Sequence, residues 1–180
     1  MKATRIGLMA VLLSLPTAIF AHRLDEYLQA TRVSVAIDRI VLKMDLTPGV
    51  DVAQSIFAQI NTDHDGRISE SEGKIYANQV LNEIALDVDG RRLHLNLISS
   101  QFPSFQEIRA GTGVVRIEAS AAWIGSPGLH SLFFQNNHKP DLGAYLVNAL
   151  VPATRDIEIT GQQRDSRQRE MRLALNVASR

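Results

Sequence analysis

The twelve residues 61–72 constrain the fold of this 180-residue chain more than any other segment. They place oxygen-bearing side chains at positions 1, 3, 5, 9 and 12 of the segment, with glycine at position 6 and isoleucine at position 8. On either side, apolar residues recur three and four apart, which is the spacing of one face of a helix. The sequence therefore predicts a helix from Val50 to Ile60, a sharply turned loop and a second helix, together covering about residues 50–86.

Alternating oxygen atoms around a tight turn are what a calcium ion requires. Ca²⁺ is bound by several oxygen ligands at about 2.3–2.6 Å, and an EF-hand loop coils alternate residues around one point to supply them. Glycine at position 6 permits the turn, because a Cβ there would clash. The segment has this pattern, and its predicted calcium ligands are Asn61, Asp63, Asp65, the backbone carbonyl of Arg67, Ser69 through a water, and Glu72 through both carboxylate oxygens.

The first ligand position weakens the predicted site, because Asn61 stands where a strong EF-hand loop has aspartate. An amide oxygen can ligate Ca²⁺ but brings no charge, so the ligand charge is −3, from Asp63, Asp65 and Glu72. We expect a dissociation constant of roughly 10⁻⁴–10⁻³ M, as in extracellular modules. The alternative is an ordinary surface turn, which explains neither Ile68 at position 8 nor the acidic residue at position 12.

The N-terminus has the three regions of a secretory signal peptide. Lys2 and Arg5 precede an uncharged apolar run over residues 6–15, and the small residue Ala21 ends the segment. This run is shorter than the about 20 residues needed to span a membrane, which argues against the alternative of a membrane anchor. We therefore expect residues 1–21 to be removed and residues 22–180 to be exported to the periplasm or secreted.

Composition excludes several classes of protein and of site. The chain has no cysteine, which excludes disulfides and thiolate metal sites. Loss of Lys2 and Arg5 with the signal peptide leaves 17 basic side chains against 19 acidic ones, a net charge of −2, so no basic field favours nucleic acid. The sequence contains no phosphate loop, nucleophile elbow or zinc-protease helix, and we expect no enzymatic activity.

Outside the helical unit, apolar residues alternate with a period of two, which is typical of half-buried strands. Asp38 and Arg39 form a predicted hairpin turn, and Asp89–Gly90 forms another rather than part of a second calcium loop. This pattern predicts one domain, an antiparallel β-sandwich of immunoglobulin-like type that carries the helix–loop–helix as an insertion. The predicted strands cover residues 28–35, 40–46, 86–88, 93–98, 113–123, 131–135, 145–151, 156–160 and 171–177.

Two histidines are candidates for binding a transition metal. Cleavage after Ala21 would leave His22 with a free α-amine beside its imidazole, and imidazole suits Cu, Ni and Zn. His138, in a polar turn over residues 136–141, is the candidate to complete this ligand set. The alternative is that His22 belongs to a frayed terminus and that His138 bonds to the backbone of its turn.

Four segments carry a resemblance to a known family: residues 22–30 after the signal peptide, the calcium loop, residues 136–141 and residues 145–152. Together they resemble the exported N-terminal domain of bacterial HupE/UreJ-type membrane proteins. The layout is also similar to small periplasmic proteins found with nickel and cobalt efflux permeases. The resemblance implies an exported domain whose partner is a membrane metal permease.

Three hypotheses for the function follow. The leading one is an exported, non-enzymatic calcium-binding domain in which Ca²⁺ mainly stabilises the fold by locking the two helices onto the sheet. A second makes the chain a metal-handling accessory protein that captures a transition metal through His22 and His138. A third makes the turn Asn136–Asp141 and the following strand, Tyr145–Val151, a docking surface for a membrane permease. For the third, the alternative is that the strand only fills the core.

Overall fold

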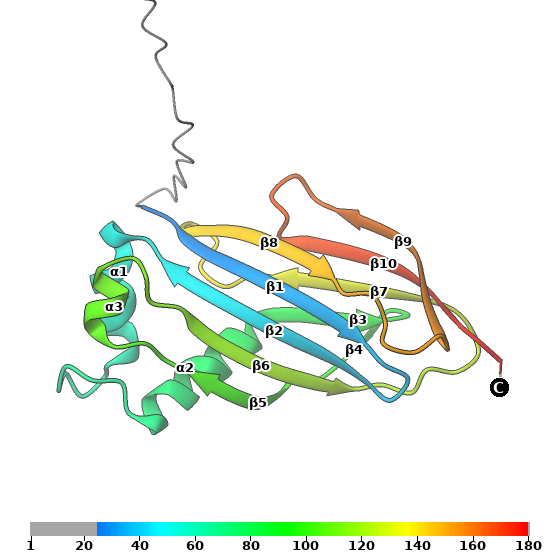
Figure 1. Ribbon diagram of the computed structural model, residues 1–180, viewed down its shortest axis with the longest axis horizontal. Coiled ribbons are helices and arrows are strands. Elements are labelled where there is room, and N and C mark those ends of the chain that lie inside the picture. Colours follow the sequence, from blue (N-terminus) through cyan, green and yellow to red (C-terminus); the bar gives the residue numbers. More distant parts are fainter. Residues whose placement is uncertain (1–24, 180) are drawn as a thin grey trace, which may run out of the picture.

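The computed structural model describes residues 25–179, and in that range the chain is mainly β (Figure 1). The signal peptide and His22 lie outside the described residues and stay predictions. The strands form two five-stranded sheets. In spatial order, the first sheet contains β5 (Asn96–Gln101), β6 (Val115–Ala122), β2 (Arg39–Pro48), β1 (Tyr27–Val35) and β8 (Gly143–Ala149). The second contains β4 (Arg91–Arg92), β3 (Ile84–Val88), β7 (Gly128–Asn136), β10 (Glu170–Val177) and β9 (Ile157–Arg164).

Among the described strands, every pair is antiparallel except the pair of β1 and β8. Tyr27 lies opposite Gly143 and Val33 lies opposite Ala149 in a parallel register. The prediction of a wholly antiparallel arrangement is therefore wrong at this pair. The physical reason is a crossover, since residues 137–142 carry the chain from β7 in the second sheet to β8 in the first, and β8 begins beside the start of β1.

One cluster of buried apolar side chains draws on both sheets, including Leu42 from the first and Leu132 from the second. Alternate residues of β1 and β2 are buried, as the period of two predicts. β1 nevertheless places two polar residues, Gln29 and Thr31, on its buried face. Buried polar side chains generally have hydrogen-bond partners, and Gln29 has them, whereas Thr31 Oγ1 has none among the described residues.

The helices lie toward one end of the sheets, at the left in Figure 1. α1 (Val50–Ile60) and α2 (Glu70–Asn82) flank the predicted loop and connect β2 to β3. α2 ends earlier than predicted, because the residues from Ile84 onward pair with β7 as strand β3. The apolar spacing of this segment fits a helix and a buried strand equally well, and pairing with β7 decides the outcome.

Two features between β3 and β6 differ from the prediction. The strand predicted over 93–98 is only partly present, because β5 covers Asn96–Gln101 and the two-residue β4 ends at Arg92. A short helix, α3 (Phe105–Arg109), has no counterpart among the predicted elements. Ser104 and Glu107 form a capping box at its start, so a local signal is present in the sequence. Five residues are too few to show a helical period.

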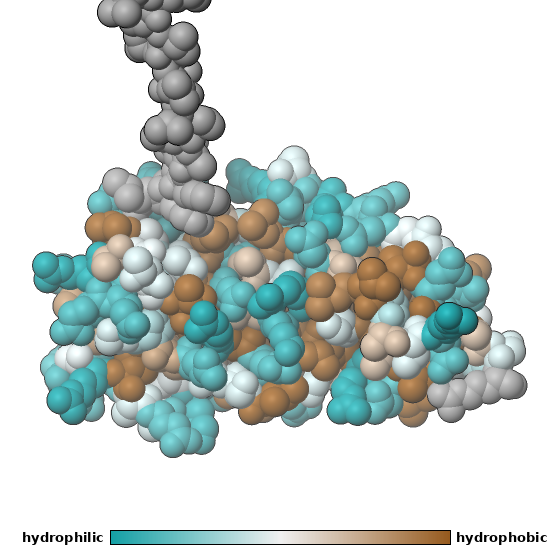
Figure 2. Space-filling model, viewed as in Figure 1, coloured by the Kyte–Doolittle hydropathy of each residue, from teal (hydrophilic) through white to brown (hydrophobic). Residues whose placement is uncertain are grey.

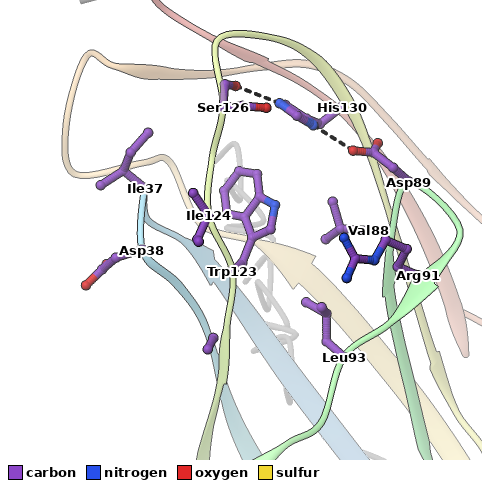
Figure 3. Close-up of a pocket in the computed structure, with 11 residues that line it drawn as sticks. Ile37, Asp38, Val88, Asp89, Arg91, Leu93, Trp123, Ile124, Ser126 and His130 are labelled. Atoms are coloured by element: carbon purple, nitrogen blue, oxygen red, sulfur yellow. Dashed lines mark hydrogen bonds and ion pairs between the residues drawn. The ribbon is translucent and has the colours of Figure 1, made fainter.

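The predicted turn at Asp89–Gly90 is present between β3 and β4. The φ angles of these two residues are 51° and 77°, in the left-handed region that Asp and Gly tolerate in tight hairpins. The Asp89 side chain also accepts a hydrogen bond from the backbone N–H of Ser131 at 2.9 Å and bonds to His130 at 2.7 Å (Figure 3). The turn is therefore fastened to the neighbouring strand β7.

Figure 2 shows apolar and hydrophilic residues mixed over the face of the molecule that Figure 1 presents. In the described range, the most exposed large apolar side chains are Ile124, Leu129 and Val151, which are 88%, 80% and 91% exposed. No helix among residues 25–179 is long and apolar enough to cross a membrane.

Candidate functional site

Hydrogen bonds from the backbone to aspartate side chains hold the loop between α1 and α2 in a tight coil. The backbone N–H of Asp65 donates to Asp63 Oδ1 at 3.1 Å, and that of Arg67 donates to Asp65 Oδ1 at 2.7 Å. His64 and Gly66 have φ angles of 61° and 84°, so the chain turns twice through the left-handed region. The alternate spacing of the acidic residues is therefore matched by a tight coil of the backbone.

Glu72 joins the two ends of this loop. Its Oε1 accepts from the N–H groups of Thr62 and Asp63 at 2.6 and 3.2 Å, and its Oε2 accepts from the N–H and hydroxyl of Ser69 at 2.9 and 2.8 Å. The hydrogen bonds from Ser69 are the main cause that lowers the pKa of Glu72 to about 2. The carboxylate is therefore ionised at neutral pH, and it forms a capping box with Ser69 at the start of α2.

The first loop position holds a buried oxygen without a partner. Asn61 is 5% exposed, and its Oδ1 forms no hydrogen bond with any described residue. An unsatisfied buried acceptor costs about 1–3 kcal/mol, and a bound cation would satisfy it. The carboxylates of Asp63, Asp65 and Glu72 and the carbonyl of Arg67 lie in the same short loop. This all-oxygen set fits Ca²⁺ and lacks the nitrogen or sulfur ligands that transition metals prefer.

The carboxylates of the loop are not gathered as they would be around an ion. Within residues 25–179, no three His, Cys, Asp or Glu side chains form a group that could hold a metal ion. Both oxygens of Glu72 instead accept hydrogen bonds from the loop itself. Calcium binding therefore requires Glu72 to exchange some of these hydrogen bonds for the ion.

The loop is supported by α3, the helix missing from the prediction. Ile68, at loop position 8, packs on a small apolar cluster of Ala53, Phe57 and Ile108. Phe105 joins this cluster, and its ring centroid lies 4.5 Å from that of Phe57. A solitary helix–loop–helix has no sister loop for Ile68 to pair with, and the contacts with α1 and α3 take that place.

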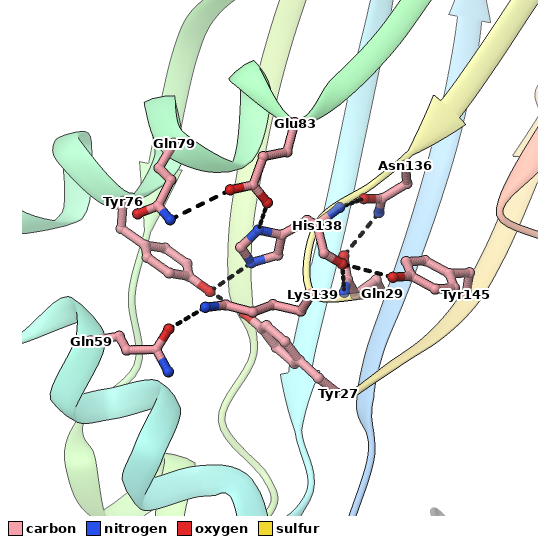
Figure 4. Close-up of polar contacts among 10 residues, drawn as sticks. All are labelled: Tyr27, Gln29, Gln59, Tyr76, Gln79, Glu83, Asn136, His138, Lys139 and Tyr145. Carbon is pink, nitrogen blue, oxygen red and sulfur yellow. Dashed lines mark hydrogen bonds and ion pairs between the residues drawn. The ribbon is translucent and has the colours of Figure 1, made fainter. Parts of the chain in front are cut away.

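The far end of α2 meets a buried polar network around His138 (Figure 4). His138 is fully buried, and its Nδ1–H donates to Glu83 Oε2 at 2.7 Å. Its Nε2 bonds to the hydroxyl of Tyr76 at 3.0 Å, and this hydroxyl also bonds to that of Tyr27 at 3.1 Å. The histidine ring therefore ties α2 to the turn after β7, and the contact between the Tyr76 and Tyr27 hydroxyls ties α2 to β1.

The backbone of the same histidine fastens the turn after β7 to β1. Gln29 Nε2 and the Tyr145 hydroxyl both donate to the His138 carbonyl, at 2.9 and 2.7 Å. Asn136 closes the arrangement, since its Nδ2 donates to Gln29 Oε1 and its Oδ1 accepts from the His138 N–H, each at 2.9 Å. These contacts explain why β1 buries Gln29.

The chain matches no protein-family model, no curated protein and no solved structure. Four residues of the network, Tyr27, Gln29, Tyr76 and Glu83, have no functional prediction from the sequence. The available signal is Gln29 at a core-facing position of a strand whose alternate residues are buried, because a buried polar side chain usually has partners.

Burial sets the charge state of the network. It lowers the pKa of His138 below its ordinary value, against the opposing effect of Glu83, and it raises the pKa of Tyr76 to about 12. A neutral His138 can donate to Glu83 and accept from Tyr76, so both ring nitrogens are occupied. A transition metal at His138 would displace one of these partners. Its predicted co-ligand, His22, lies outside the described residues.

The turn predicted as a docking surface is only partly exposed. Asn136 and His138 are buried, whereas Asp141 is exposed beside a small hollow of about 360 Å³. In the strand that follows, Tyr145 and Val147 are buried in the manner of core residues. The surface open to a partner is therefore restricted to the end of the turn and to the outward side of β8.

Proposed function

We propose that the chain is an exported, non-enzymatic calcium-binding domain in which Ca²⁺ stabilises the fold. In this proposal the two sheets pack as an immunoglobulin-like β-sandwich, and the segment between β2 and β3 is an EF-hand. The observation that carries the proposal is the buried, unpartnered Oδ1 of Asn61 at the first ligand position. The signal pattern and the resemblance to exported domains of HupE/UreJ-type proteins support a periplasmic or secreted location.

The ion would be held by oxygen atoms alone. Three carboxylates give the ligand set a charge of −3, which suits a dissociation constant of roughly 10⁻⁴–10⁻³ M. Exchange of hydrogen bonds at Glu72 opposes binding and favours the weak end of this range. The proposed ligands are Asn61, Asp63, Asp65, the Arg67 carbonyl, Ser69 through a water, and Glu72.

Calcium would stabilise the fold by tying the end of α1 to the start of α2. At free calcium ten times the dissociation constant, binding to the folded state alone contributes about 1.4 kcal/mol. Small domains are stable by only about 5–15 kcal/mol, so this contribution is a useful fraction of the total. Packing of Ile68 on α1 and α3 would support the backbone of the loop without a second EF-hand.

Thermal unfolding of residues 22–180 in calcium and in chelator tests the proposal. Calcium should raise the melting temperature of the wild type, and Glu72→Gln should remove the rise. Glutamine can still cap α2 but cannot offer two charged oxygens to the ion. Glu70→Gln is the matched control, because Glu70 lies on the same helix end and pairs only with Lys74 among the described residues. Equal wild-type melting curves with calcium and with chelator would reject the proposal.

Docking to a membrane metal permease is a second candidate, favoured by one observation. β8 is an edge strand of its sheet, and Leu146, Leu150 and Val151 on or after it are 40%, 41% and 91% exposed. Val151→Glu should abolish co-purification with the permease and change stability by less than about 0.5 kcal/mol. The nearby exposed Thr154→Glu is the control. Unchanged co-purification of Val151→Glu would exclude this surface.

A further inference from the structure

A second hollow lies at the end of the strands away from α1 and α3. It has a volume of about 550 Å³, and Figure 3 shows its walls coming from the β1–β2 turn, the β3–β4 hairpin and the segment between β6 and β7. This size falls within the roughly 300–1,000 Å³ of small-molecule sites. The residues of this hollow take no part in the calcium loop or the His138 network.

The wall of the hollow is largely apolar. Val88, Leu93 and Trp123 line its inner part, and Ile37 and Ile124 complete the wall. Trp123 is 8% exposed, whereas Ile124 is 88% exposed beside it. An exposed isoleucine at the edge of an apolar hollow can cover a bound apolar group and bury its own surface in doing so.

The polar groups of the wall mostly satisfy one another. His130 donates from Nδ1 to Asp89 and from Nε2 to the Ser126 carbonyl, each at 2.7 Å. Its ring stands edge-on to Trp123, with centroids 5.6 Å apart, and so fixes one side of the indole. The remaining acid, Asp38, pairs with Arg39 at 2.9 Å. None of these groups is left to bind a ligand strongly.

Arg91 is the exception. Its guanidinium forms no hydrogen bond or ion pair with any residue in the range 25–179, and Figure 3 shows it extending from β4 toward Trp123. The Asp89–Gly90 turn presents it there through two left-handed residues. The hollow therefore combines an apolar wall with one uncompensated positive charge. A planar guanidinium matches a carboxylate, because it can donate two parallel hydrogen bonds.

We propose that this hollow binds a medium-chain fatty acid, with the carboxylate on Arg91 and the alkyl chain against Trp123, Val88 and Leu93. A peptide fits less well, because its backbone would require several free hydrogen-bonding groups and the other polar groups of the wall are engaged. The site is separate from the calcium loop. Binding is therefore independent of calcium, and a failure of one proposal is distinguishable from a failure of the other.

Trp123 provides the measurement, because it is the single tryptophan of the chain. Decanoate, titrated below its micelle concentration, should change the tryptophan fluorescence saturably, with equal affinity in calcium and in chelator. Decanol and decyltrimethylammonium should bind at least about tenfold more weakly, a loss of 1.4 kcal/mol for the missing charged contact. Equal binding of the three amphiphiles, or no saturable change with decanoate, would overturn the proposal.

Variants separate the charged contact from the fold. Arg91→Gln should weaken decanoate binding about tenfold or more. Arg92→Gln is the matched control, because the neighbouring Arg92 pairs with Asp87 at 2.5 Å and does not line the hollow. Ile124→Glu, at the exposed edge, should also weaken binding without disturbing folding. Wild-type affinity in both Arg91→Gln and Ile124→Glu would overturn the proposal, and melting curves of all three variants establish that they are folded.

Discussion

Two histidines at opposite ends of the molecule make the same contact and have opposite charge preferences. Nδ1 of His138 lies 2.7 Å from a Glu83 carboxylate oxygen, and Nδ1 of His130 lies 2.7 Å from one of Asp89. Each ring also meets an aromatic ring edge-on with centroids 5.6 Å apart. Nevertheless, the pKa of His138 is lowered and that of His130 is raised.

Burial and the second hydrogen-bond partner explain the difference. Burial is the largest influence on the pKa of His138, and the Tyr76 hydroxyl beside its Nε2 can donate to a neutral ring. The Asp89 hydrogen bond is the largest influence on the pKa of His130, followed by the Ser126 carbonyl beside its Nε2. A carbonyl only accepts, so the ring satisfies both contacts only when it is protonated. A carboxylate contact alone therefore does not determine the charge of a histidine.

The largest expected difference between the two sites is in stability. His138→Leu leaves Glu83 and Tyr76 facing an apolar side chain, and breaking a buried network of this kind costs about 2–4 kcal/mol. His130→Leu removes an ion pair whose acid is about half exposed to solvent and should cost about 1 kcal/mol or less. Urea unfolding at neutral pH compares the two variants. Equal losses would contradict the role given to burial.

The next largest expected effect is a loss of folding stability at acidic pH, which we assign to His138. Its pKa is lowered in the folded state, so the unfolded chain takes up a proton first. The contribution of neutral His138 to the free energy of unfolding is complete above pH 6.5 and is lost as the pH falls through the folded pKa. The free energy of unfolding changes there by at most about 1.4 kcal/mol per pH unit. His138→Gln should flatten this slope in urea unfolding experiments, whereas His130→Gln should retain it. An unchanged slope in His138→Gln would assign it to another group.

His130 should show a smaller effect of the opposite sign. Its pKa is raised, so its contribution is complete below pH 6.5 and is lost as the pH rises through the folded pKa. The Asp89 side chain is 47% exposed, and solvent screening limits the effect to less than about 1 kcal/mol. Asp89→Asn should lower the pKa of His130 in an NMR titration of its ring protons. An unaltered titration would show that the carboxylate is not the cause.

The features that sequence patterns predict correctly are local ones. The helices on either side of the loop follow from apolar spacing within single segments. The Asp89–Gly90 turn depends on adjacent residues and lies where it was expected, whereas the β1–β2 turn lies one residue earlier than predicted, at residues 37–38, because Arg39 already pairs in β2. The capping box of Ser69 and Glu72 is equally local. Each of these is decided within about one helical turn or one hairpin.

The features that escape prediction depend on distant residues. The Tyr27 and Tyr76 hydroxyls meet across 49 positions, and Gln29 reaches the His138 carbonyl across 109. The parallel pair of β1 and β8 is set by a crossover between sheets, which no strand pattern records. The charge on a histidine is equally hard to predict from the sequence, because other elements of the fold contribute its hydrogen-bond partners.

The smallest expected effect tests whether calcium binding at the loop changes the surroundings of His138 but not those of His130. α2 begins near the proposed ligand Glu72, carries Tyr76 one turn later and is capped at its end by Glu83. Calcium should therefore shift the NMR ring signals of His138, which contacts both of the later residues, by a small but saturable amount. The signals of His130 should remain fixed, because its partners lie on the β3–β4 and β6–β7 turns. Glu72→Gln should abolish the shift at His138. Equal shifts at both rings would indicate a general effect of the ion, and a shift that survives in Glu72→Gln would place the ion elsewhere.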